Sequence, residues 1–139
     1  MMNAILCVDD NYGLMFNHRR QSRDRVVVEK VYDICDRQPL WINDYSSLLF
    51  NKATSIDLRI DPDFLSKARP GDYVFVENCH LLNYENEIEK LFLFKWNRIY
   101  PQDFSFDLPL DAHGWKLIST EEFAGNSHEK ITLEVYNHK

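Results

Sequence analysis

Four short runs of apolar residues constrain the fold of this 139-residue chain more than any other feature. They cover residues 4–8, 40–42, 73–76 and 91–96. Runs of this length are typical of strands that are buried on both faces, as in a parallel sheet that is covered by helices. The run at 73–76 is the strongest strand prediction, because all four of its residues are β-branched or aromatic.

Helical patterns alternate with these runs. Val26, Val27, Val31 and Ile34 recur at helical spacing, with Ser22 or Asp24 placed to cap the helix and Pro39 after its end. Shorter helices are expected over 45–50, from residue 62 to the turn at 70–72, and over 81–89. Residues 51–61 are ambiguous, because polar and apolar residues alternate over 55–60.

The end of the chain changes character. Residues 115–118 and 130–136 read as two strands, the second with the alternation of a strand that has one buried face, and 125–128 supplies the turn between them. Strands that alternate with helices and then end in a hairpin predict an α/β three-layer sandwich. Its sheet would be mixed and mostly parallel, with a C-terminal antiparallel hairpin. No linker divides the chain, so residues 1–139 are expected to form one domain.

Composition narrows the class of protein. A net charge of −6 argues against nucleic acid as a general partner, and no apolar run approaches the ~18 residues of a membrane helix. The first residues meet two aspartates early and do not resemble a signal peptide. Cys7, Cys35 and Cys79 have unrelated spacings, which favours free thiols in a reducing cytoplasm. We therefore expect a cytoplasmic protein without a membrane partner, whose oligomeric state the residues leave open.

One segment departs from the acidic balance. Arg19, Arg20, Arg23 and Arg25 crowd around Asp24 and give a local charge near +3, although residues 41–139 carry ten basic and sixteen acidic side chains. Guanidinium groups match phosphate and carboxylate oxygens bidentately, so the segment could bind an anionic small molecule or, less favoured, an RNA backbone. The alternative is a solvated loop whose arginines pair with the acidic excess elsewhere.

The five histidines are scattered, and no HxH, HxxxH or HExxH run occurs, so no metal site is predicted. His128 follows Ser127 in the expected turn, and adjacent residues alone cannot form a Ser/His catalytic pair, so we interpret it as a turn residue. Cys79 and His80 follow the central strand, where α/β proteins tend to bind ligands. A buried, inert thiol is the favoured interpretation of Cys79, with a nucleophile as the alternative.

The order of these elements resembles that of dihydrofolate reductase. Residues 5–14 (ILCVDDNYGL) resemble the A-V-D-x-N-x-G-I segment of that family, and residues 39–48 (PLWINDYSSL) its P-V-I-M-G-R-x-T-x-E-S segment. The C-terminal third matches best: 88–93, 103–106, 115–119, Phe123 and 132–136 follow the D-x-L-Y-L, G-D-x-x-F-P, W-x-x-V-S and final-hairpin segments. The resemblance implies a dihydrofolate-reductase-like fold over most of the chain.

The residues that would bind the family's nicotinamide cofactor differ. The glycine pair after the central strand is replaced by Glu77 and Asn78, which places a carboxylate where a diphosphate would approach the backbone. The Gly-Arg pair after the second strand is replaced by Asn43 and Asp44, an acid in place of a cation. We therefore predict no cofactor, and reductase activity is not expected.

Two further positions match the family. Asp24 falls where the family opens its first helix with the acid that holds the pterin, and Ser46 falls at its threonine. The alternative for Asp24 is a helix cap. The chain also resembles small bacterial proteins sometimes labelled ribonuclease Z, but that metal-dependent family requires an H-x-H-x-D-H run that is missing here.

Two functions follow as hypotheses. The first is a ligand-binding or regulatory protein that takes an anionic small molecule or a protein partner in a cleft between residues 18–25 and the ends of the first two strands. The second is a divergent enzyme that acts on a pterin-like or nucleotide-like molecule. The candidate ligand-binding residues are Asp24, Ser46, Arg19, Arg20, Arg23, Asn43, Glu77 and Asn78.

Overall fold

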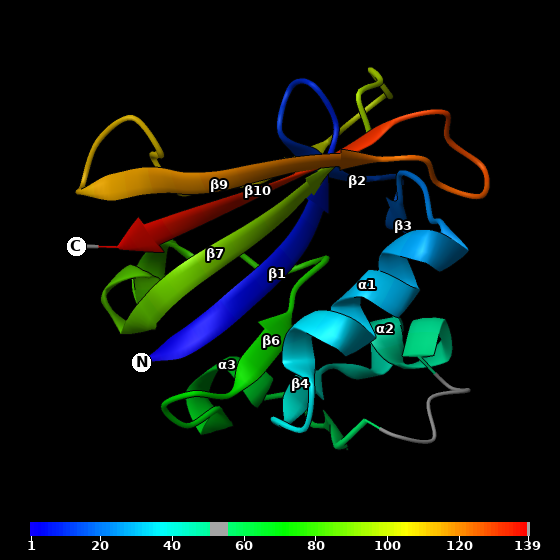
Figure 1. Ribbon diagram of the computed structural model, residues 1–139. Coiled ribbons are helices and arrows are strands. Elements are labelled where there is room, and N and C mark those ends of the chain that lie inside the picture. Colours follow the sequence, from blue (N-terminus) through cyan, green and yellow to red (C-terminus); the bar gives the residue numbers. More distant parts are fainter. Residues whose placement is uncertain (51–55, 139) are drawn as a thin grey trace.

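A seven-stranded mixed sheet forms the centre of the structure, a computed structural model that describes residues 1–50 and 56–138 (Figure 1). In order across the sheet, the strands are β5 (Leu58–Ile60), β4 (Leu40–Ile42), β6 (Tyr73–Phe75), β1 (Met2–Val8), β7 (Ile88–Lys95), β10 (Ile131–His138) and β9 (Trp115–Phe123). The four strongly apolar runs of the sequence therefore occupy adjacent positions, β4-β6-β1-β7, in the interior of the sheet.

The direction of the strands confirms the predicted fold class. The pairs β5/β4, β4/β6, β6/β1 and β1/β7 are parallel. The pairs β7/β10 and β10/β9 are antiparallel, so the C-terminal hairpin extends one side of a mostly parallel sheet. Parallel neighbours place their carboxyl ends at one edge of the sheet, where α/β proteins position ligand sites.

Helical segments cover both faces and produce three layers. On one face, α1 (Arg25–Cys35) buries Val27, Val31 and Cys35 in a cluster that also contains Ile5 and Phe75 of the sheet. The short η1 (Leu48–Phe50) follows α2 (Asp44–Ser47) and adds Phe50 to this cluster. On the other face, a second cluster joins Leu6, Val74 and Val76 to the segments α3 (Phe64–Lys67) and η2 (Leu82–Glu87). Figure 1 shows α1 and α3 on opposite sides of the sheet.

A small second sheet was not predicted from the sequence. Its strands are, in order, β3 (Arg19–Arg20), β2 (Gly13–Phe16) and β8 (Phe104–Ser105). The segment expected to be an arginine-rich loop thus begins as a strand that pairs with β2. Such short strands carry no periodic pattern, and the ladder forms because Leu14 and Met15 are buried in the core beneath it.

Two other elements differ from the expected ones. Residues 81–89 do not form an α-helix: η2 is a 3₁₀ helix, and Ile88 already belongs to β7. The ambiguous stretch that precedes Pro62 contains β5, an edge strand, while residues 51–55 lie outside the described part of the chain.

Candidate functional site

Arg20, Ser46 and Glu77 form one polar cluster at the carboxyl ends of β4 and β6. Arg20 Nε and Nη2 donate to the two carboxylate oxygens of Glu77 at 2.7 and 3.0 Å, and Ser46 Oγ donates to Glu77 Oε1 at 2.8 Å. The hydrogen bonds to Glu77 raise the pKa of the Arg20 guanidinium above its ordinary value. Glu77 is buried, so the bidentate bridge neutralises a carboxylate that would otherwise be uncompensated in the interior.

Tyr45 holds Arg20 from the other side. Its ring lies 4.7 Å from the Arg20 guanidinium carbon, and its hydroxyl accepts a 2.6 Å hydrogen bond from the Arg20 backbone N–H. Sequence analysis did not identify Tyr45. The guanidinium of Arg20 is therefore already bound by protein groups on two sides and is not the free anion ligand that the arginine cluster predicted.

Asn43 and Asn78 lie beside this cluster. Asn43 caps α2 by accepting a hydrogen bond from Ser46 N at 3.3 Å, and its amide nitrogen donates to Asn78 Oδ1 at 2.8 Å. Cys79 contacts both asparagines at 3.7–3.9 Å, and burial raises the pKa of its thiol. A raised pKa disfavours the thiolate, which supports the inert interpretation of Cys79.

Asp24 caps α1, as one of the two interpretations of this residue expected. Asp24 Oδ1 accepts hydrogen bonds from the backbone N–H groups of Val26 and Asn126, both at 2.9 Å. Asp24 Oδ2 accepts from Ser127 N at 2.9 Å, Ser127 Oγ at 3.1 Å and His128 Nδ1 at 2.9 Å. Burial raises the pKa of Asp24, but these hydrogen bonds outweigh it and hold the pKa well below its usual range.

His128 is the partner that sequence analysis missed. It does lie in the segment between β9 and β10, but its side chain is only 4% exposed and its ring stacks on Trp96 with centroids 4.6 Å apart. It binds a carboxylate 104 positions earlier in the chain. No local spacing in the sequence signals such a contact.

Gly125 allows the turn to approach Asp24 closely. A Cβ at this position would overlap the Asp24 carboxylate and the Ile131 side chain. We expect Gly125→Ala to destabilise the protein by about 1–3 kcal/mol, the usual range for overpacking, measured by urea unfolding. Ala124→Ser, at the exposed neighbour, should change stability by less than about 0.5 kcal/mol. Equal stability of the two variants would contradict the close packing of this turn.

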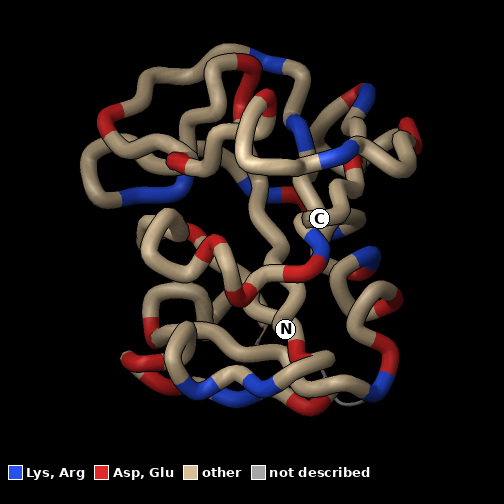
Figure 2. The backbone as a smooth tube through the Cα atoms, turned by 90° about the vertical axis from the view of Figure 1, so that its left-hand side faces the viewer, with Lys and Arg blue, Asp and Glu red and all other residues tan. Residues whose placement is uncertain are grey.

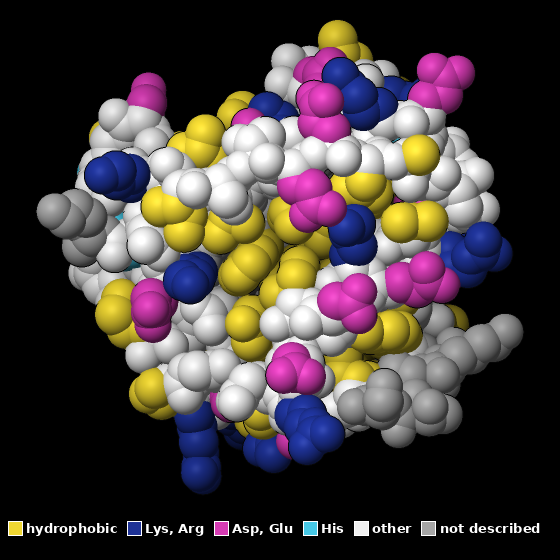
Figure 3. All heavy atoms as spheres, in the orientation of Figure 1, with side chains coloured by type: hydrophobic (Ala, Val, Ile, Leu, Met, Phe, Trp, Pro, Cys, Tyr) yellow, Lys and Arg dark blue, Asp and Glu magenta, His cyan; other side chains and the backbone are white. Residues whose placement is uncertain are grey.

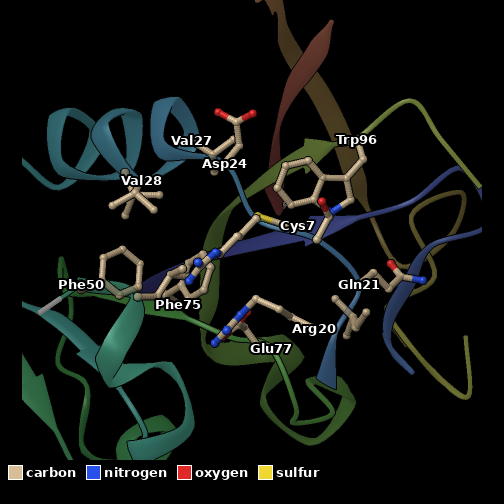
Figure 4. A pocket seen from close by; sticks show the side chains of 15 residues that line it. Cys7, Arg20, Gln21, Asp24, Val27, Val28, Phe50, Phe75, Glu77 and Trp96 are labelled. Atoms are coloured by element: carbon tan, nitrogen blue, oxygen red, sulfur yellow. The ribbon is translucent and has the colours of Figure 1, made fainter. Parts of the chain in front are cut away.

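The predicted cleft between residues 18–25 and the strand ends is nearly closed. The cavity there is about 20 Å³, with Cys7, Arg20, Ser22 and Trp96 among its lining residues. This volume accommodates about one water molecule. Figure 4 shows the Asp24 carboxylate turned away from Glu77 and from the centre of this cavity. The two predicted acids therefore do not converge on a common ligand.

An open groove lies next to the cavity, on the outer side of α1. It is about 650 Å³ in volume and is lined by Arg23, Asp24, Arg25, Val28, Glu29, Tyr32, Leu49, Asn126 and Ser127. The groove and the closed cavity share Arg23, Asp24, Val28 and Leu49. Arg25 Nε lies 4.0 Å from Glu29, and both side chains are mostly exposed. Small-molecule sites usually fall in this range of volumes.

The fold disperses the four arginines. Arg20 binds Glu77, Arg23 and Arg25 line the groove, and exposed Arg19 lines a shallower depression beside Phe16 and Pro101. Figure 2 shows basic and acidic residues interspersed along the chain, and the face in Figure 3 has no patch made of Lys and Arg alone. An extended basic track for a nucleic-acid backbone is not visible on that face.

Within residues 1–50 and 56–138, no group of three His, Cys, Asp or Glu side chains is arranged to hold a metal ion. In the same ranges, no helix has the length and apolar character needed to cross a membrane.

The fold is shared with a solved dihydrofolate reductase. The chain is similar to the structure described as dihydrofolate reductase from Enterococcus faecalis complexed with NADP(H) and RAB-propyl, with a TM-score of 0.72 and 10% sequence identity. The match covers 100% of this chain and 96% of that chain. No protein-family model and no curated protein matches, so the ribonuclease Z label gains no support. At this identity the likeness establishes a dihydrofolate-reductase-like fold alone.

Proposed function

We propose that this protein is a binding protein with a dihydrofolate-reductase-like fold, that it is not a reductase, and that it takes a small anionic molecule in the groove beside α1. The observation that carries the proposal is the contrast between the two spaces at the ends of the strands. The inner cavity has room for about one water molecule, whereas the adjoining groove has about 650 Å³ and two exposed guanidinium groups.

The inner site is a poor fit for a pterin or a nicotinamide dinucleotide. All four acceptor positions available on a carboxylate are accounted for at Asp24 by five contacts, so no lone pair remains for a pterin. Glu77 follows β6 as a buried carboxylate bridged to Arg20, at the position where a diphosphate would need bare backbone N–H groups. Both observations support a protein that does not use this cofactor.

The groove suits a flat molecule with one acidic end. Arg23 and Arg25 supply forked donors for a carboxylate or phosphate, and Tyr32, Val28 and Leu49 supply an apolar wall. Glu29 pairs weakly with Arg25 at the exposed rim, where such a pair contributes about 0–1 kcal/mol. A bound anion therefore replaces Glu29 as the partner of Arg25 at little cost.

The test is a binding titration with 4-hydroxybenzoate, an aromatic carboxylate, followed by nuclear magnetic resonance. We expect saturable shifts in Arg23, Arg25, Tyr32 and Asn126. Loss of each arginine should weaken binding by about tenfold, because a hydrogen bond to a charged group contributes about 1.5 kcal/mol or more. The matched control is Arg19→Ala, an exposed arginine outside the groove, which should leave the dissociation constant unchanged.

Two results would contradict the proposal. One is binding of 4-hydroxybenzoate that persists unchanged when Arg23 and Arg25 are both alanine. The other is a saturable thermal stabilisation by NADPH, since a ligand at about 100 times its dissociation constant adds about 2.7 kcal/mol to the free energy of unfolding. We expect NADPH to leave the melting temperature unchanged.

A further inference from the structure

Ser22, His128 and Asp24 lie in a row beside the groove. Ser22 Oγ is 2.9 Å from His128 Nε2, and His128 Nδ1 is 2.9 Å from Asp24 Oδ2. Ser22 lies between β3 and α1, two residues before the cap Asp24, and the packing of the β9–β10 turn against the start of α1 brings His128 to both. These are the contacts that join nucleophile, general base and orienting carboxylate in serine hydrolases.

The surroundings fix the tautomer that such a site needs. The hydrogen bonds to Asp24 keep it an ionised acceptor, so His128 Nδ1 carries a proton and donates it. His128 Nε2 is then left with a lone pair facing the Ser22 hydroxyl. Stacking on Trp96 limits rotation of the ring. Two more hydroxyls touch the imidazole: Ser127 Oγ at 3.2 Å from Nδ1 and Tyr100 Oη at 3.3 Å from Nε2.

The position of Ser22 is not explained by the needs of the buried acid. Asp24 receives its five hydrogen bonds without any contribution from Ser22. Ser22 is half-buried, at the boundary between the interior and solvent, and lines the cavity of about 20 Å³ together with Cys7, Val27 and Trp96. Arg23, the next residue along the chain, lines both this cavity and the open groove.

We infer that Ser22 is the nucleophile of an esterase site in which His128 is the general base and Asp24 orients it. The small cavity limits the acyl group to about the size of acetyl, and the groove receives the remainder of the ester. The preference for an anionic alcohol portion rests on the proposed binding of anions by Arg23 and Arg25, whereas the reactivity of Ser22 does not.

The reaction needs only the ester and water. Ser22 Oγ attacks the carbonyl carbon while His128 Nε2 takes the hydroxyl proton, and the Tyr100 hydroxyl is placed to donate to the oxyanion. When the ester bond breaks, His128 returns the proton to the departing alcohol and Ser22 is left acylated. Water then gives a proton to His128 and its hydroxide attacks the acyl carbon. Release of the acid and return of the proton to Ser22 restore the site.

The first test uses a neutral fluorophosphonate probe on the whole protein, with the labelled residue found by mass spectrometry. Labelling is expected at Ser22, to be lost in Ser22→Ala, and to persist in Ser119→Ala, which removes an exposed hydroxyl of β9. His128→Asn should slow labelling by about 10²-fold or more. The wild-type rate should rise with pH as the imidazole is deprotonated. Absence of labelling at Ser22, or equal labelling rates in wild type and folded His128→Asn, would overturn the inference.

The second test measures the class of substrate. Wild type should hydrolyse 4-acetoxybenzoate faster than the neutral phenyl acetate, and Ser22→Ala should hydrolyse neither above the rate in buffer. Ser22→Ala removes one hydroxyl from a half-buried position, so it is expected to fold, which circular dichroism checks. In the Arg23→Ala/Arg25→Ala variant the preference for the charged ester should vanish while fluorophosphonate labelling remains. Labelling of Ser22 without any preference in wild type would retain the nucleophile and overturn the anionic substrate class.

Discussion

Replacing Asp24 with alanine is expected to lower the free energy of unfolding by about 3–5 kcal/mol, the usual cost of removing one partner of a buried ion pair. The Asp24 side chain is fully buried, and its loss leaves His128 and the backbone N–H groups of Val26, Asn126 and Ser127 without their acceptor. A folded domain has a stability of about 5–15 kcal/mol, so this variant should be near the limit of folding. Urea unfolding measures the difference.

The same residue makes stability depend on pH. The pKa of Asp24 is lower in the folded protein than the value of about 3.9 in an unfolded chain. Its contribution is therefore complete above pH about 4 and is lost as the pH falls through the folded pKa. Asp24→Asn, which retains a capping side chain, should lack this contribution. The stabilities of wild type and Asp24→Asn should thus converge as the pH is lowered from 5 toward 2; a constant difference would count against an ionised Asp24.

Removing Arg20 is expected to have the next largest effect. Arg20→Met leaves the buried Glu77 carboxylate with Ser46 as its remaining side-chain donor within the described part of the chain, and should cost about 3 kcal/mol. This is the lower end of the range for a buried pair, because the Arg20 side chain is 22% exposed and water screens part of the charge. The double variant Arg20→Met/Glu77→Met should regain most of the loss, since an apolar pair of similar volume removes the uncompensated charge.

Lys67 and Asp61 provide the control for this experiment. Their ion pair is as short, at 2.6 Å, but the Lys67 side chain is 53% exposed. Lys67→Met should therefore change stability by less than about 1 kcal/mol. If Arg20→Met and Lys67→Met cost the same, or if the double variant is no more stable than Arg20→Met, the bridge to Glu77 does not have the role assigned to it.

Local patterns in the sequence predicted the architecture. The spacing of Val27 and Val31 predicted α1, residue type and position predicted its cap at Asp24, and unbroken apolar runs predicted the parallel strands. Each of these signals depends on residues within a few positions of one another. Short strands such as β2 and β3 form only because the core beneath them and β8, far along the chain, are in place, so they carried no such signal.

The candidate site was less accessible to prediction because its contacts join distant residues. Arg20 was identified as a possible anion ligand, but its actual partner lies 57 positions later. His128 was interpreted as a turn residue, and only the folded structure places it against Asp24 and Ser22. Residue types alone indicated the charges, whereas the distances between them depend on how the sheet and the turn pack together.

The central position of β1 has a consequence for how the protein is made. During synthesis β1 leaves the ribosome first, yet its two neighbours in the sheet begin at Tyr73 and Ile88. The amino-terminal strand must therefore wait, with its apolar residues unpaired, until two thirds of the chain has emerged; at about 5–20 residues per second this takes seconds. Asp24 waits longer still, because three of its donor residues are 126–128. Closure of that network is thus among the last steps of folding, and a nascent chain halted before residue 126 would expose an uncapped carboxylate to the chaperones that meet it.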